Sequence, residues 1–218
     1  MKKIWIIGLG QFGLHAFRYL SKKNKDIQFV LVDPVEAKLI QAAGPNRSLE
    51  PADGVSFLER NLGSDEEPDW IIPALPIHLA AEWCLARQKP ERFSRVPLPA
   101  EIKPLLPNPM EASNGDIYVS HADFRCPGDC AEPRDICTVT RKPRKRNMFE
   151  VLADLKMPGF QSLVIQSHQL GPGIGGYRPV MLFELLERVK QAGSTLLVST
   201  ACRCHGVVTG MARNNYID

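Results

Sequence analysis

The first 33 residues constrain the fold of this chain more than any other stretch. An apolar run over residues 3–7 leads directly into G-x-G-x-x-G at Gly8, Gly10 and Gly13. A second apolar run, residues 27–32, ends at Asp33. A strand, a glycine-rich turn, a helix and an acid closing the second strand form the dinucleotide-binding fingerprint in its structural context. The sequence therefore predicts a Rossmann-like parallel sheet at the N-terminus.

Each glycine of the fingerprint has a separate physical task. Gly8 permits the tight turn after the strand, Gly10 lets a pyrophosphate approach the backbone, and Gly13 lets the helix pack closely on the sheet. The N–H groups at the start of the helix then face the phosphates. Asp33 is expected to accept hydrogen bonds from the adenosine ribose, which favours NAD over NADP.

This stretch also resembles a known family. Residues 6–13, with Gln11 and Phe12 among the predicted cofactor-binding residues, and the strand end at residues 32–34 resemble the nucleotide-binding domain of potassium-uptake regulators of the Trk/KTN (TrkA-N) type. The resemblance covers residues 1–40. It implies that NAD(H) or an adenine nucleotide binds at the three glycines and Asp33. It also implies an alternative role as a nucleotide-sensing regulatory subunit, which forms oligomers and has a membrane transporter as its partner.

Composition narrows the class of protein. The chain has 218 residues, enough for one large or two small domains. Its net charge of +3 does not by itself predict a nucleic-acid or membrane partner. No apolar run approaches the ~20 residues of a membrane helix, and glycines interrupt the apolar N-terminus, unlike the core of a signal peptide. We therefore expect a cytoplasmic protein.

The pattern along the chain predicts an α/β fold: a Rossmann-like parallel sheet with a second, smaller, Cys-containing α/β portion. Residues 1–88 read as the dinucleotide-binding unit, with a third strand expected at 55–58 and another at 69–72. Residues 89–146 read as a connection that contains a cysteine segment, a strand at 117–120 and a basic run at 141–146. Within it, the proline density of residues 89–115 predicts a long surface loop. Residues 147–218 form the second portion, which either extends the first sheet or folds as a separate domain.

Within the second portion, helices are expected after Asn147 and at Pro179. Asn147 and Glu150 have the spacing of a capping pair. Strands are expected at 162–166 and 195–200, the latter being the last one that the sequence shows clearly.

Five cysteines lie in two loop-like patches. The first has the spacing C-x3-C-x6-C, and the second is the tetrapeptide Cys-Arg-Cys-His. The candidate metal ligands are Cys126, Cys130, Cys137, Cys202, Cys204 and His205. Zinc takes four nitrogen or sulfur ligands and an iron–sulfur cluster takes four thiolates. We expect three ligands from the first patch and one from the second.

Alternatives to a metal site remain open at this stage. The thiols of the two patches can be plain loop residues, or Cys202 and Cys204 can form a redox-active dithiol. His121 is a further possible ligand, whereas Cys84 lies on an apolar helix face and is expected in the core. The basic run 141–146 either attracts an anion to the site or is a solvated loop.

Two histidines are candidates for acid–base catalysis. His78 follows the strand at 69–72, and the carboxyl ends of such strands line the ligand crevice. The alternative is a first-turn histidine bonded to backbone. His168 precedes a second glycine-rich loop, residues 171–176, whose layout suits an anion, although a plain turn is the rival interpretation.

The sequence thus predicts an NAD(H)-binding protein with a thiolate-bound zinc or iron–sulfur site and a redox role. Whether it is an enzyme stays open. Besides the regulatory subunit, a structural zinc protein without catalytic activity is an alternative. A homo-oligomer is possible, and no nucleic-acid partner is expected.

Overall fold

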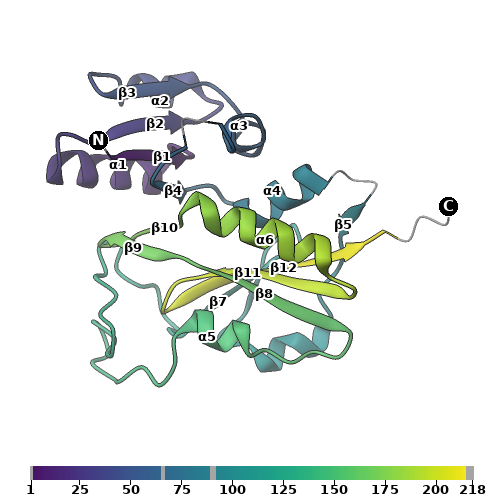
Figure 1. Cartoon of the computed structure of the whole chain (residues 1–218). Coiled ribbons are helices and arrows are strands. Elements are labelled where there is room, and N and C mark those ends of the chain that lie inside the picture. The colour runs from purple at the N-terminus through teal and green to yellow at the C-terminus, as the bar shows by residue number, and fades with distance from the viewer. Residues whose placement is uncertain (1, 65–66, 89–91, 215–218) are drawn as a thin grey trace.

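The structure is a computed structural model that describes residues 2–64, 67–88 and 92–214. A four-stranded sheet lies above a six-stranded sheet, with helices between them, and a two-stranded sheet lies beside them (Figure 1). This arrangement confirms the predicted α/β class, with a parallel N-terminal sheet and a separate mixed sheet. No helix among the described residues has the length and apolar character needed to cross a bilayer.

The N-terminal sheet is parallel throughout, in the order β3-β2-β1-β4. This order places the ends of β1 and β2 next to each other. The elements of this part are β1 (Lys3–Ile7), α1 (Gln11–Lys23), β2 (Gln28–Val32), α2 (Glu36–Ile40), β3 (Arg47–Glu50), α3 (Gly54–Asn61), β4 (Trp70–Pro73) and α4 (Leu79–Gln88).

The second sheet is mixed, in the order β6-β7-β12-β11-β8, with β5 also paired to β12. The segments 89–146 and 147–218 thus contribute strands to the same sheet. Its elements are β5 (Phe93–Arg95), the 3-10 helix η1 (Ala100–Leu105), β6 (Met110–Glu111), β7 (Ile117–Ser120), α5 (Met148–Ala153), β8 (Phe160–Gln166), β9 (His168–Gly171), β10 (Ile174–Gly176), α6 (Pro179–Gln191), β11 (Thr195–Ala201) and β12 (His205–Arg213).

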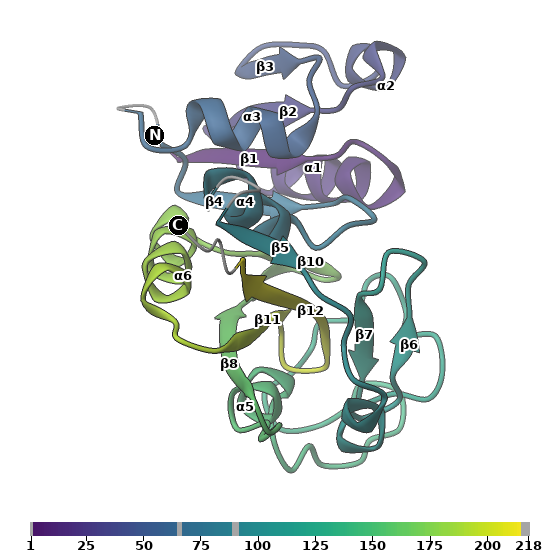
Figure 2. The ribbon, with the colours of Figure 1, turned by 90° about the vertical axis from the view of Figure 1, so that its right-hand side faces the viewer.

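One hydrophobic core joins the two sheets. Trp5 and Ile7 of β1 belong to the same buried cluster as Leu163 of β8 and Val198 of β11; α3 also contributes to this cluster, and α4 and α6 lie between the sheets (Figure 2). Each such buried side chain contributes about 1.5–3 kcal/mol to stability. Cys84 is fully buried in this cluster, as the sequence predicted. The two parts therefore do not pack as independent bodies.

The predicted strand at 55–58 is wrong, because these residues belong to α3. The side chain of Asp53 accepts a hydrogen bond from the Ser56 N–H at 2.9 Å and caps the helix. A Cβ on Gly54 would lie 2.4 Å from Ile7, so glycine lets α3 approach the sheet. The third strand is instead β3, whose mostly half-buried residues lack a strong apolar signal.

The expectation of a surface loop over 89–115 is wrong for the part of it that the structure describes. Phe93 is buried in β5 and Ile102 of η1 is fully buried. The prolines stand where no N–H is needed: Pro99 precedes η1, and Pro104 lies near its end. Residues 89–91 lie outside the described part.

Two further corrections concern the C-terminal portion. The last strand is β12 rather than the one at 195–200, and it pairs with β11, β7 and β5. The glycine-rich stretch 171–176 is not an open loop, because it forms the end of β9, the turn and β10 of a β-hairpin. Tyr177, just after the hairpin, exchanges two backbone hydrogen bonds with Ile71 of β4, at 2.9 and 3.0 Å. The hairpin thus ties the second portion to the edge of the first sheet.

Candidate metal and nucleotide site

The glycine-rich turn combines a left-handed residue, a close backbone contact and an open position. Gly8 has φ +95°, a conformation in which a side chain is strained. A Cβ on Gly13 would lie 2.0 Å from the Gly8 carbonyl oxygen, whereas one on Gly10 would meet no atom within 4 Å. Helix α1 begins without a side-chain cap and with no acid in its first turn. Its first N–H groups and the space above Gly10 therefore suit an anion.

Asp33 lies beside this turn, and its carboxylate is already engaged. It is 3% exposed. Its oxygens accept hydrogen bonds from the Leu9 N–H at 2.8 Å and the Val35 N–H at 2.9 Å, and from the Lys38 ammonium at 3.2 and 3.3 Å. Burial opposes ionisation, but these hydrogen bonds together hold the pKa of Asp33 below its usual value. A ribose hydroxyl would have to take the place of Lys38, the one partner that can move freely.

The cysteines line a large cavity of about 1120 Å³. Its wall includes all five thiols of the two patches, namely those of Cys126, Cys130, Cys137, Cys202 and Cys204. His121 and His205 also line it, and so does Phe12, which is 65% exposed at the start of α1. The cavity thus extends from the thiol loops to the helix that follows the glycine-rich turn.

The two cysteine patches meet because β12 pairs with β7, with His205 opposite Ser120. The His121 N–H donates to the Cys204 carbonyl at 2.9 Å and continues this pairing. On the other side, Gly173 of the β9–β10 turn donates its N–H to the Cys130 carbonyl at 3.0 Å. A Cβ on Gly173 would lie 1.8 Å from the Gly128 carbonyl oxygen. Close backbone packing against the cysteine loop therefore accounts for this glycine.

Three of the cysteine sulfurs accept hydrogen bonds from backbone N–H groups two or three residues later in the chain. Cys130 Sγ accepts from the Glu132 N–H at 3.4 Å, and Cys137 Sγ from the Thr140 N–H at 3.5 Å. Cys202 Sγ accepts two such bonds, at 3.4 Å from Cys204 and 3.3 Å from His205. Hydrogen bonds of this kind stabilise a thiolate and tune the metal that it binds.

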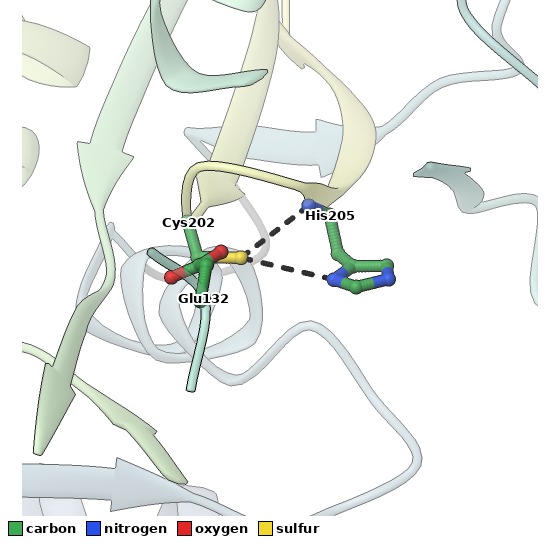
Figure 3. A group of neighbouring side chains, drawn as sticks. All are labelled: Glu132, Cys202 and His205. Carbon is green, nitrogen blue, oxygen red and sulfur yellow. Dashed lines mark hydrogen bonds between the residues drawn. The ribbon is translucent and has the colours of Figure 1, made fainter. Parts of the chain in front are cut away.

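Glu132, Cys202 and His205 form a compact group (Figure 3). Each residue offers one atom that can bind a metal, and these three atoms lie within 4.8 Å of one another. Among the described residues, no other group of three or more such atoms lies this close together. Cys202 Sγ lies 3.9 Å from His205 Nδ1. The Glu132 carboxylate accepts a hydrogen bond from the Cys204 N–H at 3.0 Å. Of the predicted ligands, Cys126, Cys130, Cys137 and Cys204 line the cavity without joining this group, and within the described part of the chain they form no second group of this kind.

Sequence reasoning missed Glu132. Its carboxylate belongs to a residue that is only 8% exposed, and its φ of +43° is unusual for a residue other than glycine. Such backbone conformations cost free energy and cluster at functional sites. The available signal was its place two residues after Cys130, inside the cysteine segment.

The electrostatics of the cavity oppose free thiolates. Burial, followed by the charge of Glu132, raises the pKa of Cys202 to about 12. Burial also raises the pKa of Cys204 to about 11, although Arg144 opposes the shift. Burial and the neighbouring charges of Cys130, Cys137 and Glu132 raise the pKa of Cys126. Cys137 differs, because hydrogen bonds from Thr140 lower its pKa.

Arg144 gives the basic run 141–146 a structural role that the sequence did not indicate. Its guanidinium donates to the Pro133 and Arg134 carbonyl oxygens at 2.8 and 2.7 Å, and to Cys204 Sγ at 2.9 Å. One cation of the run therefore points inward and braces the cysteine loop.

His78 lies in the core and does not line the cavity. Its Nδ1 and Nε2 contact the hydroxyls of Thr209 at 2.7 Å and Thr200 at 2.8 Å. Thr209 donates to Asp116, which is paired with Arg95 at 2.9 Å. Burial lowers the pKa of His78 to about 4, with Asp116 opposing the shift. Its partners are therefore threonine side chains and not the backbone groups that we considered for a first-turn histidine.

His168 is exposed on β9 and packs edge-on against Trp70, with 5.7 Å between the ring centroids. It does not line the described cavity either, whereas its neighbours Ser167 and Gln169 do. The catalytic roles of His78 and His168 stay predictions.

Fold and site define an α/β protein in which a glycine-rich turn after the first parallel strand and a thiol-lined cavity stand side by side. Residues 80–214 match the AF_1314_C family, described as "Uncharacterized protein, C-terminal domain", and the chain belongs to this family. The match begins in α4, and so it includes the cavity's thiols but not the glycine-rich turn. An uncharacterized protein of Archaeoglobus fulgidus is 28% identical over 222 residues, which cover 95% of this chain and 98% of that protein. No solved structure gives a significant match.

Proposed function

We propose that this chain is an NAD(H)-binding protein with a redox role, whose second portion holds a metal centre through cysteine thiolates. One observation carries the proposal. The cavity that contains the five thiols also has Phe12 in its wall, and Phe12 belongs to the G-x-G-x-x-G turn and its helix. A dinucleotide bound at that turn would extend toward the thiols.

The nucleotide part is supported by the turn itself. The open space above Gly10, the forced glycine at position 13 and the uncapped start of α1 are what a pyrophosphate needs. Asp33 stands next to the turn but spends its hydrogen-bonding capacity on Leu9, Val35 and Lys38. Ribose recognition by Asp33 therefore requires the Lys38 side chain to move.

Calorimetry with NADH tests the nucleotide part. Gly10→Ala leaves the turn intact but fills the space that the pyrophosphate needs, so we expect it to abolish binding. Gly193→Ala is the matched control, since a Cβ there also meets no atom within 4 Å and the site is remote in sequence from the turn. Wild-type protein that binds neither NADH nor an adenine nucleotide would refute the proposal.

The metal part is supported by the donor chemistry. Cys126, Cys130 and Cys137 share the cavity with Cys204, and the charge of Cys130 is the smallest of the influences on the Cys204 pKa. We propose Cys204 as the fourth ligand. The hydrogen bonds to Cys130 Sγ and Cys137 Sγ fit thiolates that hold a metal. Such a centre would supply either a structural zinc or one-electron transfer by an iron–sulfur cluster.

Elemental analysis and a visible spectrum of anaerobically purified protein separate these outcomes. Iron with inorganic sulfide and a coloured protein supports the redox role. Colourless protein with zinc, together with no NADH binding, supports the structural zinc alternative. We expect Cys137→Ser to lose the metal in either case, and protein free of iron and zinc that cannot be reconstituted refutes the centre.

The regulatory alternative shares the nucleotide site and differs in its assembly. It requires stable oligomers and a membrane transporter as a partner. Light scattering distinguishes the two, since a monomer at all concentrations, with and without NADH, argues against a regulatory subunit.

A further inference from the structure

The group formed by Glu132, Cys202 and His205 is not used by the four-thiolate centre proposed above. It is built from two segments, the cysteine loop and the turn between β11 and β12, and all three residues line the cavity. Its donors are one oxygen, one sulfur and one nitrogen. This mixed set suits a cation of intermediate softness such as Zn²⁺ or Fe²⁺.

The spacing of the donors is close to what such a cation requires. Tetrahedral zinc with bonds of about 2.0–2.3 Å places its ligand atoms roughly 3.3–3.7 Å apart. Cys202 Sγ and His205 Nδ1 lie 3.9 Å apart, and all three ligand atoms lie within 4.8 Å of one another. Small side-chain movements therefore suffice to close the group around an ion.

Two features hold the group in place before any ion binds. The Cys202 sulfur accepts N–H groups from Cys204 and His205, and the Glu132 carboxylate accepts the Cys204 N–H. In this position the backbone of Glu132 has φ +43°. The structure thus maintains a strained residue that aims a buried carboxylate at a thiol.

A nucleophilic cysteine is the rival interpretation of this pair of Cys202 and His205. A reactive cysteine needs a lowered pKa, usually from a cationic neighbour. Here burial and the adjacent Glu132 carboxylate raise the pKa of Cys202 to about 12. An acid beside a thiol opposes nucleophilic activation, whereas a bound cation would be attracted by both groups.

We propose that Glu132, Cys202 and His205 bind a single divalent cation, Zn²⁺ or Fe²⁺, and leave one coordination position open to the cavity. Three protein ligands with an open position are typical of catalytic rather than structural zinc sites. The open position would take a water molecule or an oxygen atom of a small substrate. The site is separate from the four-thiolate centre, so the chain holds two metal sites of different type.

Metal titration of the full-length protein, stripped with a chelator, tests this assignment. Zn²⁺ affinity and stoichiometry are measured by competition with a chromogenic chelator, and Co²⁺ serves as the spectroscopic probe. Glu132→Gln keeps an oxygen that can accept the Cys204 N–H but removes the charge. We expect it to weaken one zinc by at least about 10-fold. Asp123→Asn is the matched control, because Asp123 lines the same cavity outside the group.

Two more variants identify the ligands. Cys202→Ser should remove the single thiolate-to-cobalt charge-transfer band of this site. Cys137→Ser should remove the other centre and leave this band in place. Circular dichroism and the thermal midpoint establish that each variant is folded.

The two proposals fail in different ways. Unchanged zinc affinity, stoichiometry and cobalt spectrum in folded Glu132→Gln overturns the new site, whatever Cys137→Ser does. Metal loss in Glu132→Gln and Cys202→Ser, with no effect of Cys137→Ser, supports the new site and refutes the four-thiolate centre.

Discussion

The two halves of this molecule, the N-terminal unit up to residue 88 and the remainder of the chain, build their polar sites in opposite ways. At the glycine-rich turn, Asp33 meets Leu9, a residue 24 positions away, at the ends of neighbouring parallel strands. In the cavity, Glu132 meets Cys204, which is 72 positions away, and does so only because β12 returns alongside β7. The first site is a property of one supersecondary unit, whereas the second is a property of the whole fold.

The difference also shows in how each site is completed. Asp33 is satisfied by two backbone groups and one lysine and needs no ligand to balance its charge. In the cavity, the raised thiol pKa values and the buried Glu132 describe a group of donors that gains most from a cation. We therefore expect the N-terminal unit to be indifferent to metal and the cavity to depend on it.

The largest expected effect tests whether the two halves are separable at all. Gly13→Ala places a Cβ 2.0 Å from the Gly8 carbonyl oxygen, and backbone cannot yield as a side chain can. We expect a loss of about 3 kcal/mol in the free energy of unfolding. Gly10→Ala should stay within about 0.5 kcal/mol, since its Cβ meets nothing.

Urea unfolding followed by tryptophan fluorescence and by circular dichroism measures both variants. Because Trp5 and Val198 share one core, a single transition should shift as a whole. Two separate transitions in Gly13→Ala, with the second at its wild-type position, would contradict a shared core and show that the halves unfold independently.

The sequence predicts the first half well because its signals are local. The glycine turn, α1, β2 and β4 each follow from periodicity and turn residues within a few positions. The mistaken strand at 55–58 has the same origin. Four consecutive apolar or small residues fit the period of a strand as well as that of a helix. The Asp53 cap, which favours the helix, lies outside these four residues.

The second half is predicted only in its parts. The two cysteine patches were recognisable as ligand sources, but their meeting depends on β12, which the sequence pattern did not reveal. Glu132 was invisible because nothing local marks a carboxylate that folds back on a turn 72 positions later. Nor can a charge pattern tell that Arg144 turns inward while the residues around it stay solvated.

A pH titration of stability probes the junction between the halves, where His78 lies. Its pKa falls from 6.5 to about 4 in the folded protein, so the unfolded chain takes up the proton first as the pH drops. The contribution of His78 to the free energy of unfolding is therefore complete above pH 6.5 and is lost as the pH falls toward about 4. Between pH 7 and pH 5 we expect a loss of about 2 kcal/mol from this group.

Urea unfolding at the two pH values gives this slope for the wild type and for His78→Asn. The variant is less stable overall, and its dependence on pH in this window should be smaller. Asp33 and Asp116 have lowered pKa values, so their contributions are lost only at more acidic pH, below their usual value of 3.8. An equal slope in both proteins would show that folding does not lower the pKa of His78.

The smallest expected effect on stability addresses the first half alone. Lys38→Gln removes an ion pair in which the lysine side chain is 42% exposed, so stability should change by no more than about 0.5 kcal/mol. The same change frees the outer lone pairs of Asp33, which the ribose hydroxyls of a dinucleotide would use. Since Lys38 competes for them with about 0.5 kcal/mol, NADH affinity should rise about 2-fold.

Calorimetry with NADH compares Lys38→Gln with Lys22→Gln, an exposed lysine in the last turn of α1 that should change nothing. An affinity gain confined to Lys38→Gln would mean that Asp33 recognises the ribose and that its present partners are a resting arrangement. Equal NADH affinity in all three proteins would instead mean that Asp33 only fixes the turn through Leu9. The nucleotide would then be held at the turn by backbone groups alone, whereas the cavity would hold its metal through side chains.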